Sequence, residues 1–241
     1  MTQNSQTKPI GVLGGMGPEA TVLLQQKLIA ATPAQDDADH IPLLIDMNPQ
    51  VPSRIAHLIE GTGEDPGPTL TAMAQRLETA GAGALAMPCN TAHSYASAIV
   101  GAVAIPLLNM IDLAADHALA TLGKGGRVGL LASPAVRRTQ LFETALQARG
   151  LTPLWPQADA PLLTAIRAIK AQGPCQQARD ILSSASEDLL ANGAGLQFVA
   201  CSEFSMIARS TAPGARVVDT LDLLVTAMVQ FQPAGPTPTP A

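Results

Sequence analysis

Short apolar runs alternate along the chain with longer segments in which apolar residues recur at helical spacing. Such runs are typical of buried strands, and the longer segments are typical of amphipathic helices. The predicted strands are residues 10–14, 41–47, 84–87, 105–109, 127–132, 196–200 and 216–218. The predicted helices are residues 20–31, 69–80, 91–100, 111–122, 139–149, 159–172, 176–191 and 220–230. This alternation indicates an α/β fold of parallel sheets with helices on both faces.

The order of these elements occurs twice, before and after a polar, glycine-rich connector at residues 123–126. In each half an opening strand is followed, roughly 70 to 80 residues later, by a strand that leads into a cysteine. These cysteines are Cys89 and Cys201. We interpret the pattern as a duplication. Each copy would place its cysteine at the carboxyl end of a parallel strand, where open α/β sheets form their ligand sites.

The length of 241 residues suits two lobes. We expect residues 1–112 to form the first lobe, completed by residues 215–232, and residues 113–214 to form the second. Residues 233–241 are rich in proline and threonine and have almost nothing to bury, so they predict a disordered tail.

The composition of the chain limits the classes of partner that the protein is expected to bind. The net charge of -5 and the aromatic content of 2% argue against a nucleic-acid surface and favour a small molecule. Residues 1–9 lack the basic start and apolar centre of a secretory signal, so a cytoplasmic location is expected. Residues 79–111 carry no Asp, Glu, Lys or Arg, but their longest apolar run, residues 98–108, is shorter than the roughly 20 residues that span a bilayer. No membrane partner is expected.

The three cysteines are expected to be free thiols. Cys89, Cys175 and Cys201 are widely spaced, which fits neither a disulfide framework nor a zinc site. Cys175 has no counterpart in the other half, and we interpret it as structural or incidental. His40 follows several aspartates, but no second ligand cluster accompanies it, so a structural loop histidine is favoured over a metal ligand.

Cys89 and Cys201 share a context that points to chemistry. Each ends an apolar strand and is followed by a short polar residue, Asn90 or Ser202, that can begin a helix. The N-terminus of a helix stabilises a thiolate and binds a carboxylate. A single buried cysteine more often packs as a small apolar residue. Two matched thiols facing one cavity instead favour a racemase, in which one thiolate removes an α-proton and the opposite thiol returns a proton.

Three motifs resemble the aspartate/glutamate racemase family, and its aspartate racemase branch in particular. They are Ile10-Gly11-Val12-Leu13-Gly14-Gly15-Met16-Gly17-Pro18-Glu19-Ala20-Thr21, Pro88-Cys89-Asn90-Thr91-Ala92-His93 and Cys201-Ser202-Glu203. The resemblance implies two pseudo-symmetric α/β lobes, a site in the cleft between them, commonly a homodimer, and no pyridoxal phosphate or metal. It implies an aspartate racemase in which Cys89 and Cys201 are the opposed acid and base.

The resemblance also implies substrate-binding residues. Arg54 matches the arginine that holds a substrate carboxylate, although by itself it could be a solvated loop residue. Lys170 matches a lysine that meets the side-chain carboxylate, although it could be an exposed helix residue. The other positions implied to bind substrate are Met16, Asn90, Thr91, Ser133 and Ser202. His93, four residues after Cys89, could support its ionisation or could cap and pack its helix.

Some positions depart from the family pattern. Ser53 precedes Arg54 where the family commonly has Asp, and residues 133–136 lack the glycine and one hydroxyl of the usual loop. Glu203 stands where glutamate racemases tend to have histidine, which favours the aspartate branch. The alternatives that stay open are a glutamate or broad-specificity amino-acid racemase, a superfamily decarboxylase or maleate-type isomerase, and an inactive dicarboxylate-binding protein.

Overall fold

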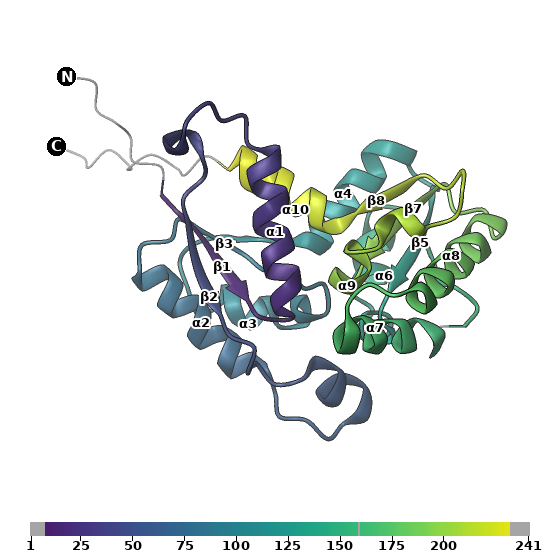
Figure 1. The fold of residues 1–241 in the computed structure, drawn as a ribbon, viewed down its shortest axis with the longest axis horizontal. Helices are drawn as coiled ribbons and strands as arrows, with labels where there is room; N and C mark the ends of the chain where they lie inside the picture. Colours follow the sequence, from purple (N-terminus) through teal and green to yellow (C-terminus); the bar gives the residue numbers. More distant parts are fainter. Residues whose placement is uncertain (1–7, 159, 232–241) are drawn as a thin grey trace.

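Two four-stranded parallel sheets form the framework of the protein (Figure 1). A computed structural model describes residues 8–158 and 160–231. The first sheet has the order β2-β1-β3-β4, with β2 (Leu43–Met47), β1 (Ile10–Gly14), β3 (Ala84–Ala86) and β4 (Leu107–Leu108). The second has the order β6-β5-β7-β8, with β6 (Thr152–Leu154), β5 (Arg127–Ala132), β7 (Leu196–Ala200) and β8 (Val217–Asp219). The matching order confirms the predicted α/β class and its two pseudo-symmetric lobes.

Helices connect the strands, as parallel pairing requires. The first half contains α1 (Pro18–Ala31), α2 (Gly67–Thr79), α3 (Ala96–Val100) and α4 (Met110–Leu122). The second half contains α5 (Pro134–Thr139), α6 (Leu141–Ala148), α7 (Ala160–Gln172), α8 (Gln176–Ala191), α9 (Ser202–Ser205) and α10 (Thr220–Gln230). Across the part of the chain that the structure describes, no helix combines the length and apolar character needed to cross a membrane.

Each sheet is buried on both faces, which explains why its central strands are almost wholly apolar. On the second sheet, α4 and α6 cover one face, and α7 and α8 cover the other. On the first sheet, α2 and α3 pack on one face, and α1 and α10 pack on the other. All five residues of β1 and of β7 are buried. The strand ends are thereby held rigidly, and the turns that follow them can position side chains.

The end of the described chain joins the two halves. Strand β8 belongs to the second sheet, whereas α10, which follows it directly, packs against α1 and α4 (Figure 1). Leu224 and Val225 of α10 share an apolar cluster with Ile10 and Val12 of β1. The predicted tail at residues 233–241 lies outside the described residues.

Several predicted elements differ in the structure. The segment expected as one helix at residues 91–100 is a 3-10 helix, Thr91–Tyr95, followed by α3. The helix expected at residues 139–149 is interrupted at Gln140, whose φ of 54° is left-handed, and α5 begins before it. The last predicted strand is shifted to β8. Strand β6 was not predicted from the sequence. Its Pro153 lacks an N–H donor, but the strand lies at the sheet edge, where that loss is tolerated.

Candidate functional site

A pocket of about 400 Å³ lies at the carboxyl ends of strands from both sheets. Met16 follows β1, Cys89 follows β3, Ser133 follows β5 and Cys201 follows β7. Of the residues expected to form a site, the pocket lining includes Met16, Arg54, Cys89, Thr91, Ser133, Lys170 and Cys201. Segments far apart in the sequence therefore meet at the position where α/β sheets form ligand sites.

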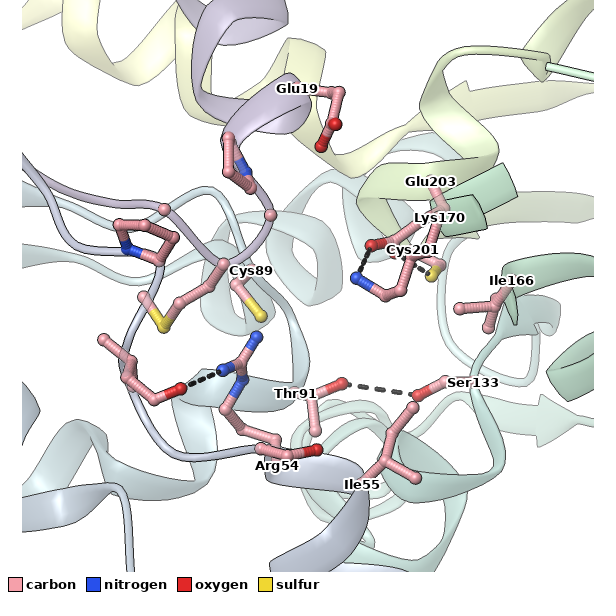
Figure 2. Close-up of a pocket in the computed structure, with 17 residues that line it drawn as sticks. Glu19, Arg54, Ile55, Cys89, Thr91, Ser133, Ile166, Lys170, Cys201 and Glu203 are labelled. Atoms are coloured by element: carbon pink, nitrogen blue, oxygen red, sulfur yellow. Dashed lines mark hydrogen bonds and ion pairs between the residues drawn. The ribbon is translucent and has the colours of Figure 1, made fainter. Parts of the chain in front are cut away.

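Cys89 and Cys201 lie on opposite sides of this pocket (Figure 2). Both are free thiols, and they are 7% and 8% exposed. Each is held by the backbone turn at the end of a buried strand, so neither side chain depends on a mobile surface loop. The arrangement gives one pocket two thiols that approach it from different halves of the chain.

The Cys201 side of the pocket carries an ionic network. The Sγ of Cys201 donates to Oε2 of Glu203 at 3.0 Å, and Oε1 of Glu203 forms an ion pair with Nζ of Lys170 (Figure 2). Burial, and then the Glu203 carboxylate, raise the pKa of the Cys201 thiol well above its ordinary value. Burial opposes the charge of Lys170, but Glu203 and the two cysteines outweigh it, so the pKa of Lys170 is raised. Cys201 is thus held as a thiol beside a charged lysine.

Arg54 is held by its own loop. Its Nη1 donates to the carbonyl oxygens of Val51 at 3.2 Å and Pro52 at 3.1 Å. These carbonyls orient the guanidinium without a carboxylate at position 53, where the chain has serine. Figure 2 shows the guanidinium extending into the pocket on the Cys89 side. It can therefore meet an anion in the pocket.

A pair of hydroxyl groups connects the two halves of the chain within the same pocket. Thr91 Oγ1 and Ser133 Oγ lie 3.3 Å apart. Ser133 is also the N-cap of α5, because its hydroxyl accepts a hydrogen bond from the N–H of Val136 at 3.4 Å. The capping bond fixes Ser133 and thereby orients its contact with Thr91.

Asn90 and Ser202 are not among the residues that line the pocket. Asn90 is 3% exposed, and its amide donates to the hydroxyl of Thr220 at 3.0 Å. Thr220 in turn donates to the carbonyl of Val199 in β7 at 3.1 Å. Ser202 is 6% exposed and begins α9. The Asn90 side chain therefore links the Cys89 turn to the strand that carries Cys201.

His93 is a neutral structural bridge. Its Nε2 accepts from the N–H of Met110 at 3.1 Å, so the other nitrogen, Nδ1, carries the proton and donates to the carbonyl of Cys89 at 2.9 Å. Burial lowers the pKa of His93 to about 4. Both ring nitrogens bond backbone groups, which agrees with the packing interpretation of this residue. Among the described residues, no group of three or more His, Cys, Asp or Glu side chains could hold a metal ion.

Two acidic residues of the pocket were not predicted as site residues, Glu203 and Glu19. Glu203 is two residues beyond Cys201 in the first turn of α9, so its closeness to the thiol could have been inferred from the sequence. Its ion pair with Lys170 could not, because the two residues lie on different helices. Ile55 and Ile166 contribute apolar side chains to the lining of the same pocket.

Comparisons with known proteins identify a family and support the fold. The family model for Asp/Glu/Hydantoin racemase matches residues 13–228. The broad specificity amino-acid racemase RacX of Bacillus subtilis (strain 168) is 26% identical over 166 residues, which are 66% of this chain and 70% of RacX. The structure of Picrophilus torridus aspartate racemase has a TM-score of 0.82 and 27% identity, covering 92% of this chain and 93% of that chain. An aspartate racemase homologue from Pyrococcus horikoshii OT3 has a TM-score of 0.71 and 20% identity, covering 92% and 98%, and supports the fold.

The chain therefore belongs to the Asp/Glu/Hydantoin racemase family, and it is an amino-acid racemase of that family. This confirms the resemblance seen in the three sequence motifs.

Proposed function

We propose that the protein interconverts L-aspartate and D-aspartate by a two-thiol acid and base mechanism that uses no cofactor. Cys89 and Cys201 act on opposite faces of the substrate α-carbon. One thiolate takes the α-proton, and the opposite thiol gives its proton to the other face. The observation that carries this proposal is that both thiols line one pocket from opposite sides.

Carbanion stabilisation is the main demand of this reaction, because the α-proton of an amino acid is weakly acidic. Arg54, which extends into the pocket on the Cys89 side, would hold the α-carboxylate and stabilise it as it takes up charge. Thr91, Ser133 and the backbone of Met16 would orient the substrate. Asn90 and Ser202 would contribute through the backbone of the turns that begin at the cysteines.

The preference for aspartate rests on Lys170 and on one comparison. Lys170 lines the pocket and would meet the side-chain carboxylate of the substrate. The structure of Picrophilus torridus aspartate racemase, at 27% identity, supports this assignment. The similarity to RacX supports a second candidate, a broad-specificity amino-acid racemase.

Deuterium exchange without added cofactor tests the proposal. The protein is incubated in D₂O with L-aspartate, and in parallel with L-glutamate, a neutral amino acid and a basic one. We expect α-deuteration of aspartate together with D-aspartate. α-Deuteration of amino acids from several side-chain classes would favour the broad-specificity candidate. Binding of aspartate without exchange would overturn the proposal in favour of a binding protein, and conversion without inversion would favour a decarboxylase or isomerase of the superfamily.

Single cysteine variants test the mechanism in the same assay. Cys89→Ser and Cys201→Ser should each abolish racemisation, leaving at most exchange from one enantiomer. Cys175→Ser is the matched control, because Cys175 is a free thiol outside the pocket lining, and it should retain activity. Full racemisation by either pocket variant would contradict the two-thiol mechanism.

Three further expectations stay predictions: a homodimer, a cytoplasmic location, and the division into residues 1–112 with 215–232 and residues 113–214. Sedimentation velocity of the full chain measures the first. Limited proteolysis tests the division, which predicts early cleavage in the turn near residue 214.

A further inference from the structure

The two cysteines stand in equivalent turns but have unlike neighbours. The second residue after Cys89 is Thr91, whose hydroxyl pairs with the hydroxyl of Ser133. The second residue after Cys201 is Glu203, whose carboxylate bonds the thiol itself. A hydroxyl pair is neutral, whereas the Glu203 carboxylate carries charge and pairs with Lys170. The pseudo-symmetry of the strands is therefore not shared by the groups that surround the thiols.

Glu203 uses its two oxygens for different partners. One accepts the S–H of Cys201 at 3.0 Å, and the other pairs with Lys170. The Glu203 side chain is 11% exposed and Cys201 is 8% exposed, so the contact between the carboxylate and the thiol is largely shielded from water. A thiolate at Cys201 would face this carboxylate at close range, and low solvent access makes such repulsion stronger. The carboxylate thus favours the protonated form of Cys201.

Lys170 extends from α7 across the pocket. Its Nζ lies 3.8 Å from the position that a Cβ on Gly17 would take, and Oε2 of Glu19 lies 3.2 Å from the same position. The Lys170 side chain remains 42% exposed, so it stays accessible to a ligand. The ionisable side chains that line the pocket are Glu19, Arg54, Cys89, Lys170, Cys201 and Glu203.

We infer that Glu203 is a positioning residue that keeps Cys201 protonated in the free enzyme while it holds Lys170 at the pocket wall. Cys201 is then the proton donor of the free enzyme, and Cys89 is the base. In this direction the α-C–H bond breaks as S–H forms at Cys89, and the Cys201 S–H bond breaks as C–H forms on the opposite face. This role rests on the proposed two-thiol function, and it names a residue to which that function assigned no part.

Lys170 has a second part in this arrangement. After Cys201 has given up its proton, its thiolate faces Glu203, and the Lys170 cation offsets the negative charge of both. A substrate carboxylate that binds Lys170 would compete with Glu203 for the same cation. Binding of a substrate in the pocket would therefore change the electrostatic environment of the Cys201 thiol.

Alkylation of the free enzyme tests the inference without requiring turnover. Iodoacetamide is reacted with the full-length protein over a range of pH, and modification of Cys201 and Cys89 is followed separately by peptide mass spectrometry. Because a thiolate reacts and a thiol does not, the Cys201 to Cys89 rate ratio reports how far Glu203 suppresses ionisation of Cys201. We expect Glu203→Gln to raise this ratio at least ten-fold. Lys170→Met should lower it, because the offsetting cation is removed.

Matched variants separate charge from structure. Glu203→Asp retains the carboxylate and should restore a low ratio at least in part. Glu60→Gln removes a carboxylate that pairs with Arg167 outside the pocket lining, and it should leave the ratio unchanged. A merely structural role of Glu203 would change the Cys201 rate by the same factor at every pH, whereas loss of the carboxylate should shift the pH at which Cys201 begins to react. An unchanged ratio in Glu203→Gln, or a change of the same sign in Lys170→Met, would overturn the inference.

Racemisation kinetics give the second measurement. Glu203→Gln should lower kcat/KM for aspartate at least ten-fold, with partial rescue in Glu203→Asp. If the wild-type protein exchanges no aspartate, the proposed function fails, and the alkylation ratio still decides the role of Glu203. If exchange occurs and the ratio does not respond to Glu203→Gln, only the inference about Glu203 fails.

Discussion

The imidazole Nε2 of His93 accepts a hydrogen bond from the backbone N–H of Met110 at 3.1 Å. Met110 is the first residue of α4, so its N–H has no partner within the helix. The opposite ring nitrogen donates to the carbonyl of Cys89. One neutral side chain thus satisfies two buried backbone groups, and it ties the turn of a pocket thiol to the start of a helix.

His93 should make the stability of the protein depend on pH. Its pKa is about 4 in the folded chain because of burial, and that of an unfolded histidine is about 6.5. The unfolded state therefore binds the proton more readily, and stability present above pH 6.5 is lost as the pH falls toward 4. Between pH 7 and pH 5 this contribution is about 2 kcal/mol. The free energy of unfolding is measured with urea at pH 7 and at pH 5. Its decrease between these pH values should be about 2 kcal/mol smaller in His93→Gln than in the wild type.

The control for this experiment is Leu85→Ala, which removes a fully buried side chain of β3 without touching a titrating group. It should be destabilised at pH 7 but keep the wild-type pH dependence. Equal pH dependence in wild type and His93→Gln would contradict a neutral, buried His93.

Gly15 should tolerate no side chain. Its φ is 90°, and a Cβ there would lie 2.4 Å from the backbone carbon of Asn48. Gly15→Ala should therefore cost about 2 kcal/mol or more of unfolding free energy, measured with urea. Gly61→Ala is the matched control, because its φ is 67° but a Cβ would meet nothing within 4 Å. It should cost only about 1 kcal/mol, and an equal cost at both positions would argue against the close approach of the two loops.

Arg54→Lys should impair substrate binding although it keeps the positive charge. Lysine cannot present a planar pair of donors to a carboxylate, nor can it reproduce the orientation given by the carbonyls of Val51 and Pro52. We expect KM for aspartate to rise at least ten-fold, or about 1.4 kcal/mol of binding free energy. Arg76→Lys alters a surface arginine paired with Asp46 and should leave KM unchanged. Equal KM values for Arg54→Lys and wild type would rule out bidentate binding at Arg54.

Thr91 and Ser133 should be energetically coupled. A double-mutant cycle of Thr91→Val and Ser133→Ala, measured by urea unfolding, should give an interaction energy of about 0.5 to 1 kcal/mol. Ser133→Ala alone should cost more than Thr91→Val, because it also removes the N-cap of α5, which contributes about 1 kcal/mol. Additive effects would show that the 3.3 Å contact contributes nothing to joining the halves.

The sequence by itself determined the α/β architecture and the placement of the two cysteine thiols at strand ends. Apolar runs predicted β1, β3, β5 and β7 because central strands covered on both faces must be apolar along their length. The position of a cysteine after two equivalent strands predicted that both thiols would lie near strand ends. Such features are local, because each depends on a few consecutive residues and on whether they face water.

The tertiary structure decided which polar groups meet. Strand β6 pairs at an edge despite Pro153, and the break at Gln140 has no apolar signature, so neither follows from periodicity. The pairing of Glu203 with Lys170 joins α9 to α7. Hydrophobic burial is set by the pattern of neighbouring residues along the chain. Hydrogen bonds and ion pairs require two specific atoms within about 3 Å, and for distant segments only the packed fold brings such atoms together.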